Sequence, residues 1–349
     1  MIRECIPTLL ENKNLTREQA QETMREIMSG QTTPAQIAAF LVALKKKGET
    51  VEEVTALARV MIDFSKRIHP KVSGFLVDTC GTGGDKVKTF NVSTTSAFVV
   101  AAAGVPVAKH GNRSFTSKCG SADVMERLGV NLEMDPEKVE RSIEEVGIGF
   151  MYAPNFHPAM KNVAPVRREI GVRTVFNILG PLTNPAGANA QLIGVCDLEL
   201  LEPMARSALA LGARSVMTVH GLDGVDEISL TGTTAILSAK NGNITTEEIE
   251  PEDIGFKKTR ATNLSGSDPE ENARLTSRIL SGNMGEEDPR VQTVLANAAA
   301  ALVLSERAHD FREGIEIGTN TIKDGLALKT LHNLVEFSGG STQRAKVLA

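Results

Sequence analysis

The chain has 349 residues, 41% of them hydrophobic and 23% charged, which is ordinary for a folded protein with a sizeable core. Its net charge of -5 argues against nucleic acid or an anionic membrane as the main partner, although it leaves room for a local basic pocket. The longest apolar run, at residues 97–108, is too short to span a membrane and contains Gly104 and Pro106.

The N-terminal residues and the cysteines predict a cytoplasmic protein. Residues 1–14 carry charges at Arg3, Glu4, Glu11 and Lys13 rather than the apolar core of a signal peptide. The cysteines show no CxxC pairing, which favours free thiols in a reducing compartment; they are Cys5, Cys80, Cys119 and Cys196.

The first part of the chain predicts a small all-helical unit at about residues 1–70. Thr16 and Thr50 are each followed three positions later by Gln or Glu, which is the pattern of a capping box. Pro34 fits the first position of a helix that follows Thr33. We therefore expect helices at residues 17–29, 34–47 and 51–65, followed by a linker.

From Phe75 onward strands and helices alternate, which predicts an α/β domain with a central, mainly parallel sheet. Strands are expected at residues 75–77, 105–108, 148–152, 190–195, 215–219 and 235–238. Helices are expected at residues 95–103, 136–146, 198–211, 269–281, 289–306 and 315–337. The pair Asn241-Gly242 predicts a hairpin turn.

Two strands in residues 75–129 each end in a loop of glycines, hydroxyls and amides, with a helix start behind it. The first loop is Gly81-Thr82-Gly83-Gly84-Asp85, and the helix start Asn91-Val92-Ser93-Thr94 follows it. The second loop is Lys109-His110-Gly111-Asn112-Arg113. Glycines let backbone N–H groups approach an anion, and a helix N-terminus favours negative charge. Ligands gather at the carboxyl ends of parallel strands, so the pattern predicts a phosphate-binding site.

Structural roles compete with this interpretation. A glycine cluster can simply make a tight turn, and this one is neither a Walker loop nor a complete dinucleotide fingerprint, because Val87 stands where the third glycine belongs. Helix caps, solvated charges or a core histidine are the alternatives for Asn91, Ser93, Thr94, Lys109, Arg113 and His110. The occurrence of all of them in two consecutive loops favours the site.

Two further segments could contribute charges. Asp226 and Glu227 follow a predicted strand, and adjacent carboxylates suit Mg²⁺ bound with a diphosphate, although such a loop can also be an acidic surface turn. Arg167 lies in a segment with few other charges, where a guanidinium could pair with a substrate carboxylate or be part of a solvated helix face.

The chain resembles the anthranilate phosphoribosyltransferase family over nearly its whole length. The motifs that carry the resemblance are Gly81-Thr82-Gly83-Gly84-Asp85, Asn91-Val92-Ser93-Thr94, Lys109-His110-Gly111-Asn112-Arg113, Gly120-Ser121-Ala122-Asp123, the segments at residues 154–160 and 173–185, and Asp226-Glu227. The sequence departs from the family's usual residues at Lys86-Val87-Lys88, Phe115-Thr116 and Cys119, which bears on local loop geometry.

The resemblance implies transfer of the phosphoribosyl group from phosphoribosyl diphosphate (PRPP) to the amine of anthranilate, with Mg²⁺ as cofactor. It also implies a homodimer formed through the helical domain and an active site at the hinge between two domains. The small domain would comprise residues 1–70 and about 158–185, and the large domain residues 71–157 and 186–349. No nucleic acid or membrane partner is implied.

The resemblance also assigns residues to ligands. PRPP would be bound by Gly81, Gly84, Asp85, Thr89, Asn91, Val92, Ser93, Thr94, Lys109, His110, Gly111, Asn112, Arg113, Ser114, Phe115, Thr116, Ser117 and Ser121. Anthranilate would contact Gly81, His110, Asn112 and Arg167, and the metal would be held by Ser93, Asp226 and Glu227. No catalytic acid or base is assigned, and Arg167 and Lys109 would act by positioning.

Two alternatives stay open at this point. A pyrimidine nucleoside phosphorylase would have a related fold, but its usual Lys-His-Ser-Thr-Gly-Gly motif is absent, since Lys109-His110 is followed by Gly111-Asn112. A non-catalytic, nucleic-acid-binding relative would also share the fold, but the net negative charge and the complete motifs speak against it.

Overall fold

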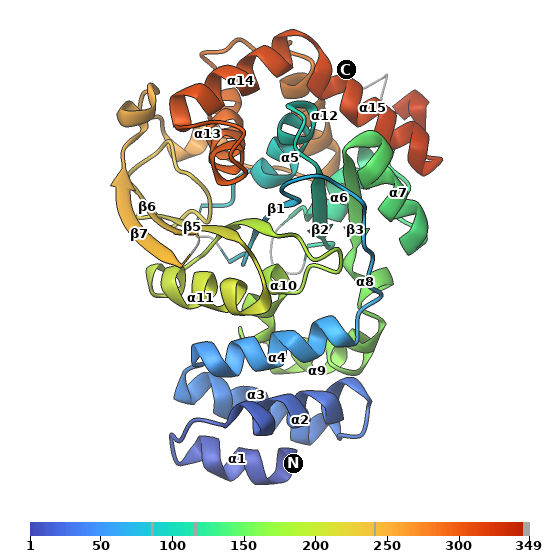
Figure 1. Ribbon diagram of the computed structural model, residues 1–349, viewed down its shortest axis with the longest axis vertical. Coiled ribbons are helices and arrows are strands. Elements are labelled where there is room, and N and C mark those ends of the chain that lie inside the picture. The colour runs from blue at the N-terminus through green and yellow to red at the C-terminus, as the bar shows by residue number, and fades with distance from the viewer. Residues whose placement is uncertain (85–86, 115–117, 241, 345–349) are drawn as a thin grey trace.

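The computed structural model describes residues 1–84, 87–114, 118–240 and 242–344. The first helices form a stack at one end of the molecule, and the α/β part, with the helices α12 to α15, lies at the other end (Figure 1). The stack consists of α1 (Ile2–Leu10), α2 (Arg17–Met28), α3 (Pro34–Lys47) and α4 (Val51–Asp63). Capping boxes at Thr16, Thr33 and Thr50 confirm the predicted helix starts, while α1 was not predicted.

A seven-stranded sheet forms the centre of the larger part, in the order β3-β2-β1-β4-β5-β6-β7. Its strands are β1 (Val77–Gly81), β2 (Val107–Gly111), β3 (Ile148–Tyr152), β4 (Ala190–Gly194), β5 (Ser215–Gly221), β6 (Thr234–Lys240) and β7 (Asn243–Ile249). The pairs from β3 to β5 are parallel, and β6 and β7 pair antiparallel, which confirms a mainly parallel sheet. The strand order reverses between β1 and β4, and in open α/β sheets such a reversal opens a crevice for ligands.

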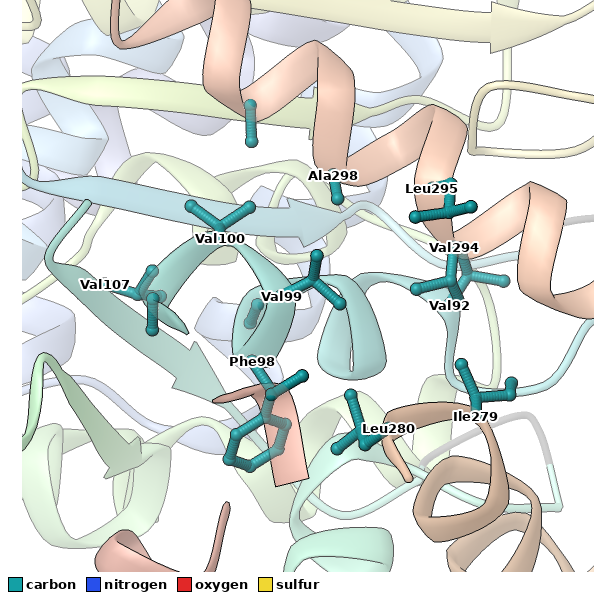
Figure 2. Close-up of a cluster of buried hydrophobic side chains, with 14 of the residues drawn as sticks. Val92, Phe98, Val99, Val100, Val107, Ile279, Leu280, Val294, Leu295 and Ala298 are labelled. Atoms are coloured by element: carbon teal, nitrogen blue, oxygen red, sulfur yellow. The ribbon is translucent and has the colours of Figure 1, made fainter. Parts of the chain in front are cut away.

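One face of the sheet is covered by α5 (Val92–Ala102) and the helices packed around it. The valine, alanine and phenylalanine side chains of α5 itself are buried, because the helix lies between the sheet and α13. Figure 2 shows Phe98 and Val99 of α5 pointing toward side chains of α12 and α13. The surrounding helices are α6 (Ser121–Arg127), α7 (Pro136–Val146), α12 (Pro269–Leu280), α13 (Pro289–Leu304), α14 (Phe311–Lys323) and α15 (Leu326–Ser338).

The predicted single helix at residues 315–337 is wrong. It is two helices, α14 and α15, because Gly325 adopts a left-handed conformation with φ of 70° and turns the chain between them. Strand β7 was also missing from the expected elements, although the predicted turn at residues 241–242 joins it to β6; Asn241 itself lies outside the described residues.

The segment after β3 returns to the helical stack. It contains α8 (Ala153–Phe156), η1 (Pro158–Asn162), α9 (Ala164–Ile170) and α10 (Phe176–Leu182). The side-chain nitrogen of Asn162 donates to the carbonyl of Met28 at 2.9 Å. Val166 and Leu179 share one hydrophobic core with α1–α4 and with sheet residues such as Ile193. The division into two domains stays a prediction, since this core continues from the helices onto the sheet.

The other face of the sheet carries α11 (Leu201–Leu211), which also packs against α4. The Arg59 side chain of α4 donates to the carbonyl of Ala210 at 3.2 Å. Short 3-10 turns complete the chain at η2 (Leu198–Leu200), η3 (Pro251–Ile254) and η4 (Ala261–Leu264). In the part of the chain that the structure describes, no helix has the length and apolar character needed to cross a membrane.

A buried ion pair holds three helix ends of the stack together. Lys47 Nζ lies 2.5 Å from Glu53 Oε2, and both side chains are almost fully buried. Glu53 also accepts from the N–H groups of Leu15 and Thr50 at 2.9 Å, and Lys47 donates to Asn14 at 2.9 Å. The carboxylate is therefore compensated by several donors, as a buried charge must be.

Replacing Lys47 by Met should destabilise the protein by about 3–5 kcal/mol, because it leaves the Glu53 carboxylate buried without its cation. Urea denaturation measures this loss. Lys13→Met is the matched control, since the ion pair of Lys13 with Glu11 is exposed and its loss should change little. Equal effects of the two substitutions would contradict the assigned role of the buried pair.

Candidate active site

The glycine loop after β1 packs directly against the loop after β5. The Gly83 N–H donates to Asp226 Oδ2 at 3.0 Å, and Asp226 is nearly buried. A Cβ on Gly81 would lie 2.5 Å from the same carboxylate oxygen, and a Cβ on Gly194 would lie 1.6 Å from the Asp226 carbonyl oxygen. Side chains are therefore sterically excluded at both glycines, and the carboxyl ends of β1, β4 and β5 meet at Asp226.

Glu227 adds a second carboxylate at this edge of the sheet. Burial raises the pKa of the Cys80 thiol well above its usual value, and the charges of Asp78 and Glu227 raise it further. The Glu227 carboxylate thus lies close to the end of β1. Within the described residues, no group of three or more His, Cys, Asp or Glu side chains is placed to hold a metal. Two carboxylates with a hydroxyl and waters nevertheless suit Mg²⁺, which keeps part of its water shell.

The N-terminus of α5 lies beside a buried ammonium group. Lys109 is 2% exposed, and its Nζ donates to the carbonyl of Thr79 and, at 3.5 Å, to Ser93 Oγ. Asn91 occupies the N-cap position of α5, but its side chain makes no cap hydrogen bond to the helix. The free N–H groups of the first turn and the ammonium group together favour an anion at this place.

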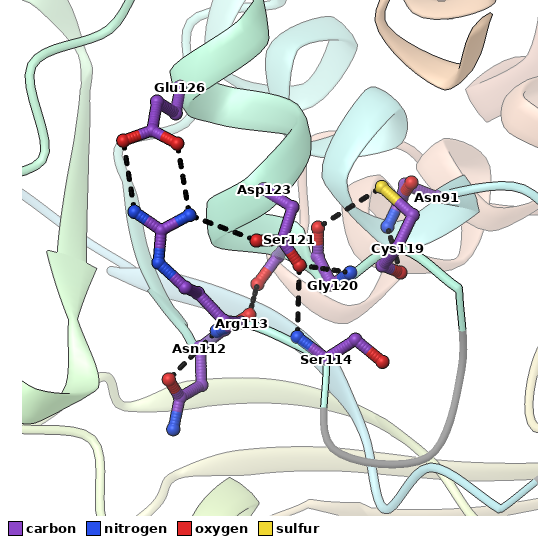
Figure 3. A network of polar contacts seen from close by, with 9 residues as sticks. All are labelled: Asn91, Asn112, Arg113, Ser114, Cys119, Gly120, Ser121, Asp123 and Glu126. Atoms are coloured by element: carbon purple, nitrogen blue, oxygen red, sulfur yellow. Dashed lines mark hydrogen bonds and ion pairs between the residues drawn. The ribbon is translucent and has the colours of Figure 1, made fainter. Parts of the chain in front are cut away.

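The loop after β2 is held by the start of α6, as Figure 3 shows. Asp123 accepts from the N–H groups of Ser114 at 3.0 Å and Gly120 at 2.9 Å. Arg113 forms a two-bond ion pair with Glu126 at 2.9 Å and another ion pair with Asp123 at 3.0 Å. These bonds raise the pKa of Arg113 and direct its charge toward α6. Arg113 therefore orders the loop, and its predicted contribution of charge to the phosphate site stays a prediction.

Two neutral imidazoles lie on the opposite face of β2, one from the strand itself and one from the residue between α8 and η1. The rings of His110 and His157 lie 5.1 Å apart, and the Nε2 atom of each is buried without a hydrogen-bond partner among the described residues. Burial lowers the pKa of His110 to about 3, and the neighbouring His157 and Lys109 lower it too. Burial lowers the pKa of His157 to about 4. Both rings are therefore uncharged at neutral pH.

A buried aspartate supports this face. Asp78 of β1 is fully buried, and its carboxylate accepts hydrogen bonds from Asn184 Nδ2 at 2.8 Å and from the His110 N–H at 3.4 Å. It also interacts electrostatically with the ammonium group of Lys109. Burial raises the pKa of the Asp78 carboxyl, and Lys109 and Asn184 counteract that rise. Asp78 thus links the phosphate-facing side of the sheet to the segment that contains α10.

One arginine contacts the glycine loop, and a second lies close enough to the first for their charges to interact. Arg173 donates to the Thr82 carbonyl and to Cys196 Sγ, both at 3.3 Å, and a Cβ on Gly84 would lie 1.9 Å from its Nη1. Arg167 of α9 is half-buried, with its guanidinium carbon 5.5 Å from the centre of the Phe176 ring. Burial lowers the pKa of Arg167, and the positive charge of Arg173 lowers it further. An anionic ligand would relieve this repulsion.

The structure thus gathers the predicted residues on two faces of one sheet edge. The α5 side contains Ser93, Thr94 and Lys109, and Asn91 and Ser121 lie nearby. The α9–α10 side contains His110 and Arg167. Thr89 pairs with Ser265 next to α5. Asp85 and Phe115-Thr116-Ser117 lie outside the described residues. Sequence reasoning did not assign Asp78, His157, Arg173 or Asn184, although the last three fall within the quoted motifs.

Comparison with known proteins defines the class first. Residues 73–328 match the profile of the glycosyl transferase family a/b domain, and residues 3–65 match that of the glycosyl transferase family helical bundle domain. The protein is therefore a glycosyltransferase that contains both of these domains.

The particular family follows from individual relatives. The chain is 53% identical to an anthranilate phosphoribosyltransferase of Symbiobacterium thermophilum, over 97% of this chain and 98% of the relative. The structure of the Thermus thermophilus enzyme matches with a TM-score of 0.89 and 42% identity, covering 96% of this chain and 99% of that one. The Saccharomyces cerevisiae enzyme, solved in complex with PRPP and Mg, matches with a TM-score of 0.90 and 27% identity, covering 97% and 98%.

The chain belongs to the anthranilate phosphoribosyltransferase family of tryptophan biosynthesis. The resemblance and the fold class expected from the sequence are confirmed.

The buried imidazole of His157 predicts an acid-sensitive stability. Between pH 6.5 and about 4 the unfolded chain gains a proton at this residue that the folded protein does not bind. Stability should therefore fall as the pH falls through this window, by about 1.4 kcal/mol per pH unit for this group. In His157→Asn, urea denaturation across the window should give a correspondingly flatter dependence on pH. The same slope as in the unsubstituted protein would contradict the burial of a neutral ring.

Proposed function

We propose that this edge of the sheet performs the family's reaction, with PRPP on the α5 face and anthranilate on the α9–α10 face. One observation carries the proposal. The buried Lys109 and the N-terminus of α5 lie on one side of β2, and the neutral histidines lie on the other. Arg167, which would receive a carboxylate, packs on Phe176 of α10, the helix whose Gly180 backbone also contacts His110. An anionic donor and an anionic aromatic acceptor can therefore approach the same strand end from opposite sides.

On the α5 face, the donors would hold the phosphate groups of PRPP. The Gly81–Gly84 loop and the first turn of α5 present backbone N–H groups, and Lys109 supplies a fixed positive charge. Ser93, Asp226 and Glu227 would hold Mg²⁺, which neutralises charge on a diphosphate when bound. Because these donors are fixed by the fold before any ligand binds, little reorganisation is needed as charge develops on the leaving group.

On the other face, positioning is the main contribution. The arylamine of anthranilate is unprotonated at neutral pH, so its lone pair can form the bond to the ribose C1′ without a strong base. As that bond forms, the C1′–oxygen bond breaks, the diphosphate leaves with the electron pair, and the amine loses its proton to solvent. Arg167 would fix the carboxylate of anthranilate, and the uncharged rings of His110 and His157 would line the apolar part of the pocket.

The assembly and the location of the protein belong to the same proposal. Leu10 and Val42 of the helical stack are large apolar residues with 54% and 48% exposure, which supports a homodimer through this stack. None of the cysteines forms a disulfide in the part of the chain that the structure describes, which supports a cytoplasmic location; they are Cys5, Cys80, Cys119 and Cys196.

The direct test mixes the purified protein with anthranilate, PRPP and Mg²⁺ and follows the loss of anthranilate fluorescence. Loss that requires all three components supports the proposal. Phosphorolysis of thymidine, or salt-dependent duplex binding without transfer, would instead favour the nucleoside phosphorylase or nucleic-acid-binding alternatives.

Arg167→Ala should raise the KM for anthranilate by about tenfold or more, because a charged hydrogen-bonded pair is lost, while the KM for PRPP stays nearly unchanged. Steady-state kinetics with each substrate varied in turn measures this split. Arg168→Ala is the matched control, since Arg168 is the next residue of α9 but is exposed. An equal rise of both KM values in Arg167→Ala would contradict the acceptor role.

The double substitution Asp226→Asn with Glu227→Gln should remove most Mg²⁺-dependent turnover, by about a hundredfold or more, because neutral amides bind Mg²⁺ weakly. The amide oxygen at position 226 can still accept from Gly83, so the loop contact is retained. Titrating Mg²⁺ against the rate measures the effect. The exposed pair Glu247→Gln with Glu248→Gln on β7 removes the same charge elsewhere and should leave the titration unchanged. Full activity of the first double variant would remove the metal assignment.

A further inference from the structure

A segment remote in sequence is paired with residues 88–90, which lead into α5. Residues 264–267, here called the strap, lie antiparallel to residues 88–90 through a bridge between Thr89 and Ser265. The Phe90 N–H donates to the Leu264 carbonyl at 3.2 Å, and the Gly266 N–H donates to the Lys88 carbonyl at 2.9 Å. The two backbones are so close that a Cβ on Gly266 would lie 2.5 Å from the Thr89 carbonyl oxygen. The strap is thus fixed against residues 88–90, just before α5.

A chain of hydrogen bonds connects the strap to the N-cap residue of α5. The Ser267 N–H donates to Asn272 Oδ1 at 2.8 Å, and Asn272 Nδ2 donates to Asn91 Oδ1 at 3.0 Å. Asn91 Nδ2 in turn donates to the carbonyl of Cys119 at 3.3 Å. Asn272 is 3% exposed on α12, so its amide is held inside the protein.

The two ends of this chain fix its direction. A backbone N–H can only donate and a backbone carbonyl can only accept, so Ser267 and Cys119 leave one consistent orientation for the two amides between them. Asn272 must give its oxygen to Ser267 and its NH₂ to Asn91. Asn91 must then turn its own NH₂ toward the loop after β2.

This orientation matters because phosphate oxygens accept hydrogen bonds and do not donate them when ionised. The Asn91 NH₂ carries two hydrogens, so it can donate to Cys119 and to a phosphate oxygen at the same time. With the amide reversed, Asn91 would present an oxygen to the phosphate and repel it. The side chain is available for this role because it does not cap its own helix.

A second contact of α12 holds the backbone separately from the amide. The Thr276 and Thr95 hydroxyls lie 3.0 Å apart, and Thr95 Oγ1 donates to the Asn91 carbonyl at 3.0 Å. The helix therefore supports α5 at two points, of which one involves the Asn91 side chain and the other does not. This separation supplies a matched control.

We propose that Asn272 is a positioning residue that sets the Asn91 amide as a hydrogen-bond donor to the phosphoribosyl donor substrate. This inference rests on the proposed function, since it assumes that PRPP binds at the α5 face. Asn272 acts through Asn91 and through the strap, and its substitution should affect the binding of one substrate and not of the other.

The test uses Asn272→Asp and Asn272→Leu. In Asn272→Asp, the carboxylate still accepts from Ser267 but cannot donate to Asn91, so the Asn91 amide reverses. In Asn272→Leu, the side chain has the same branching and introduces no charge, so this variant can fold even where Asn272→Asp does not. Each should raise the KM for PRPP about tenfold or more and change the KM for anthranilate less than about twofold. Thr276→Val removes the other contact of α12 and should lower the thermal unfolding temperature while leaving both KM values unchanged.

Unchanged KM values for PRPP in the folded Asn272 variants would overturn the inference, as would an equal rise for both substrates. A rise for PRPP in Thr276→Val as large as in Asn272→Leu would overturn it too, because support of the helix would then suffice. The unsubstituted protein is assayed in parallel. If it does not transfer the phosphoribosyl group, the proposed function fails; if it does and the Asn272 variants behave like it, only the role of Asn272 fails.

Discussion

The contact between the glycine loop and Asp226 is the constraint on which the rest of the site depends. Gly81 and Gly194 have no room for a side chain beside Asp226, and the Gly83 N–H binds its carboxylate. Strands β1, β4 and β5 therefore end at one place, where the strand order reverses. Backbone donors and carboxylates are brought together there before any ligand arrives, which is the preorganisation that electrostatic catalysis needs.

Because side chains alternate along β2, the two faces of the sheet at this strand end have different chemical environments. Lys109 points toward α5, and His110, the next residue, points toward α10. One side is polar and positively charged, whereas the other is lined by imidazoles that burial keeps neutral. A single strand therefore separates a region suited to phosphate groups from one suited to an aromatic ring, and Asp78 connects the two through its contacts with Asn184 and Lys109.

Local signals predicted much of this arrangement. The capping residues Thr16, Thr33 and Thr50 and the alternation of strands and helices gave the helical stack and the parallel sheet, because those features are encoded over short stretches. The break at Gly325 was missed because a helical pattern continues on both sides of it. The ion pair of Arg113 with Glu126 was not predicted, because Glu126 lies on α6, beyond the loop that contains Arg113. Asp78 and Asn272 act through contacts between distant segments, which no local pattern shows.

The hydrophobic core that runs from α1–α4 through α9 and α10 to the sheet has a consequence for cooperativity. Helices α1–α4 belong to the same hydrophobic core as Ile193 and Val216 of the sheet, so part of their apolar burial depends on the larger part. Arg167 lies on a helix within this shared core. Loosening of the stack would therefore be transmitted through this core to the helix that carries Arg167, the residue proposed to bind the carboxylate of anthranilate.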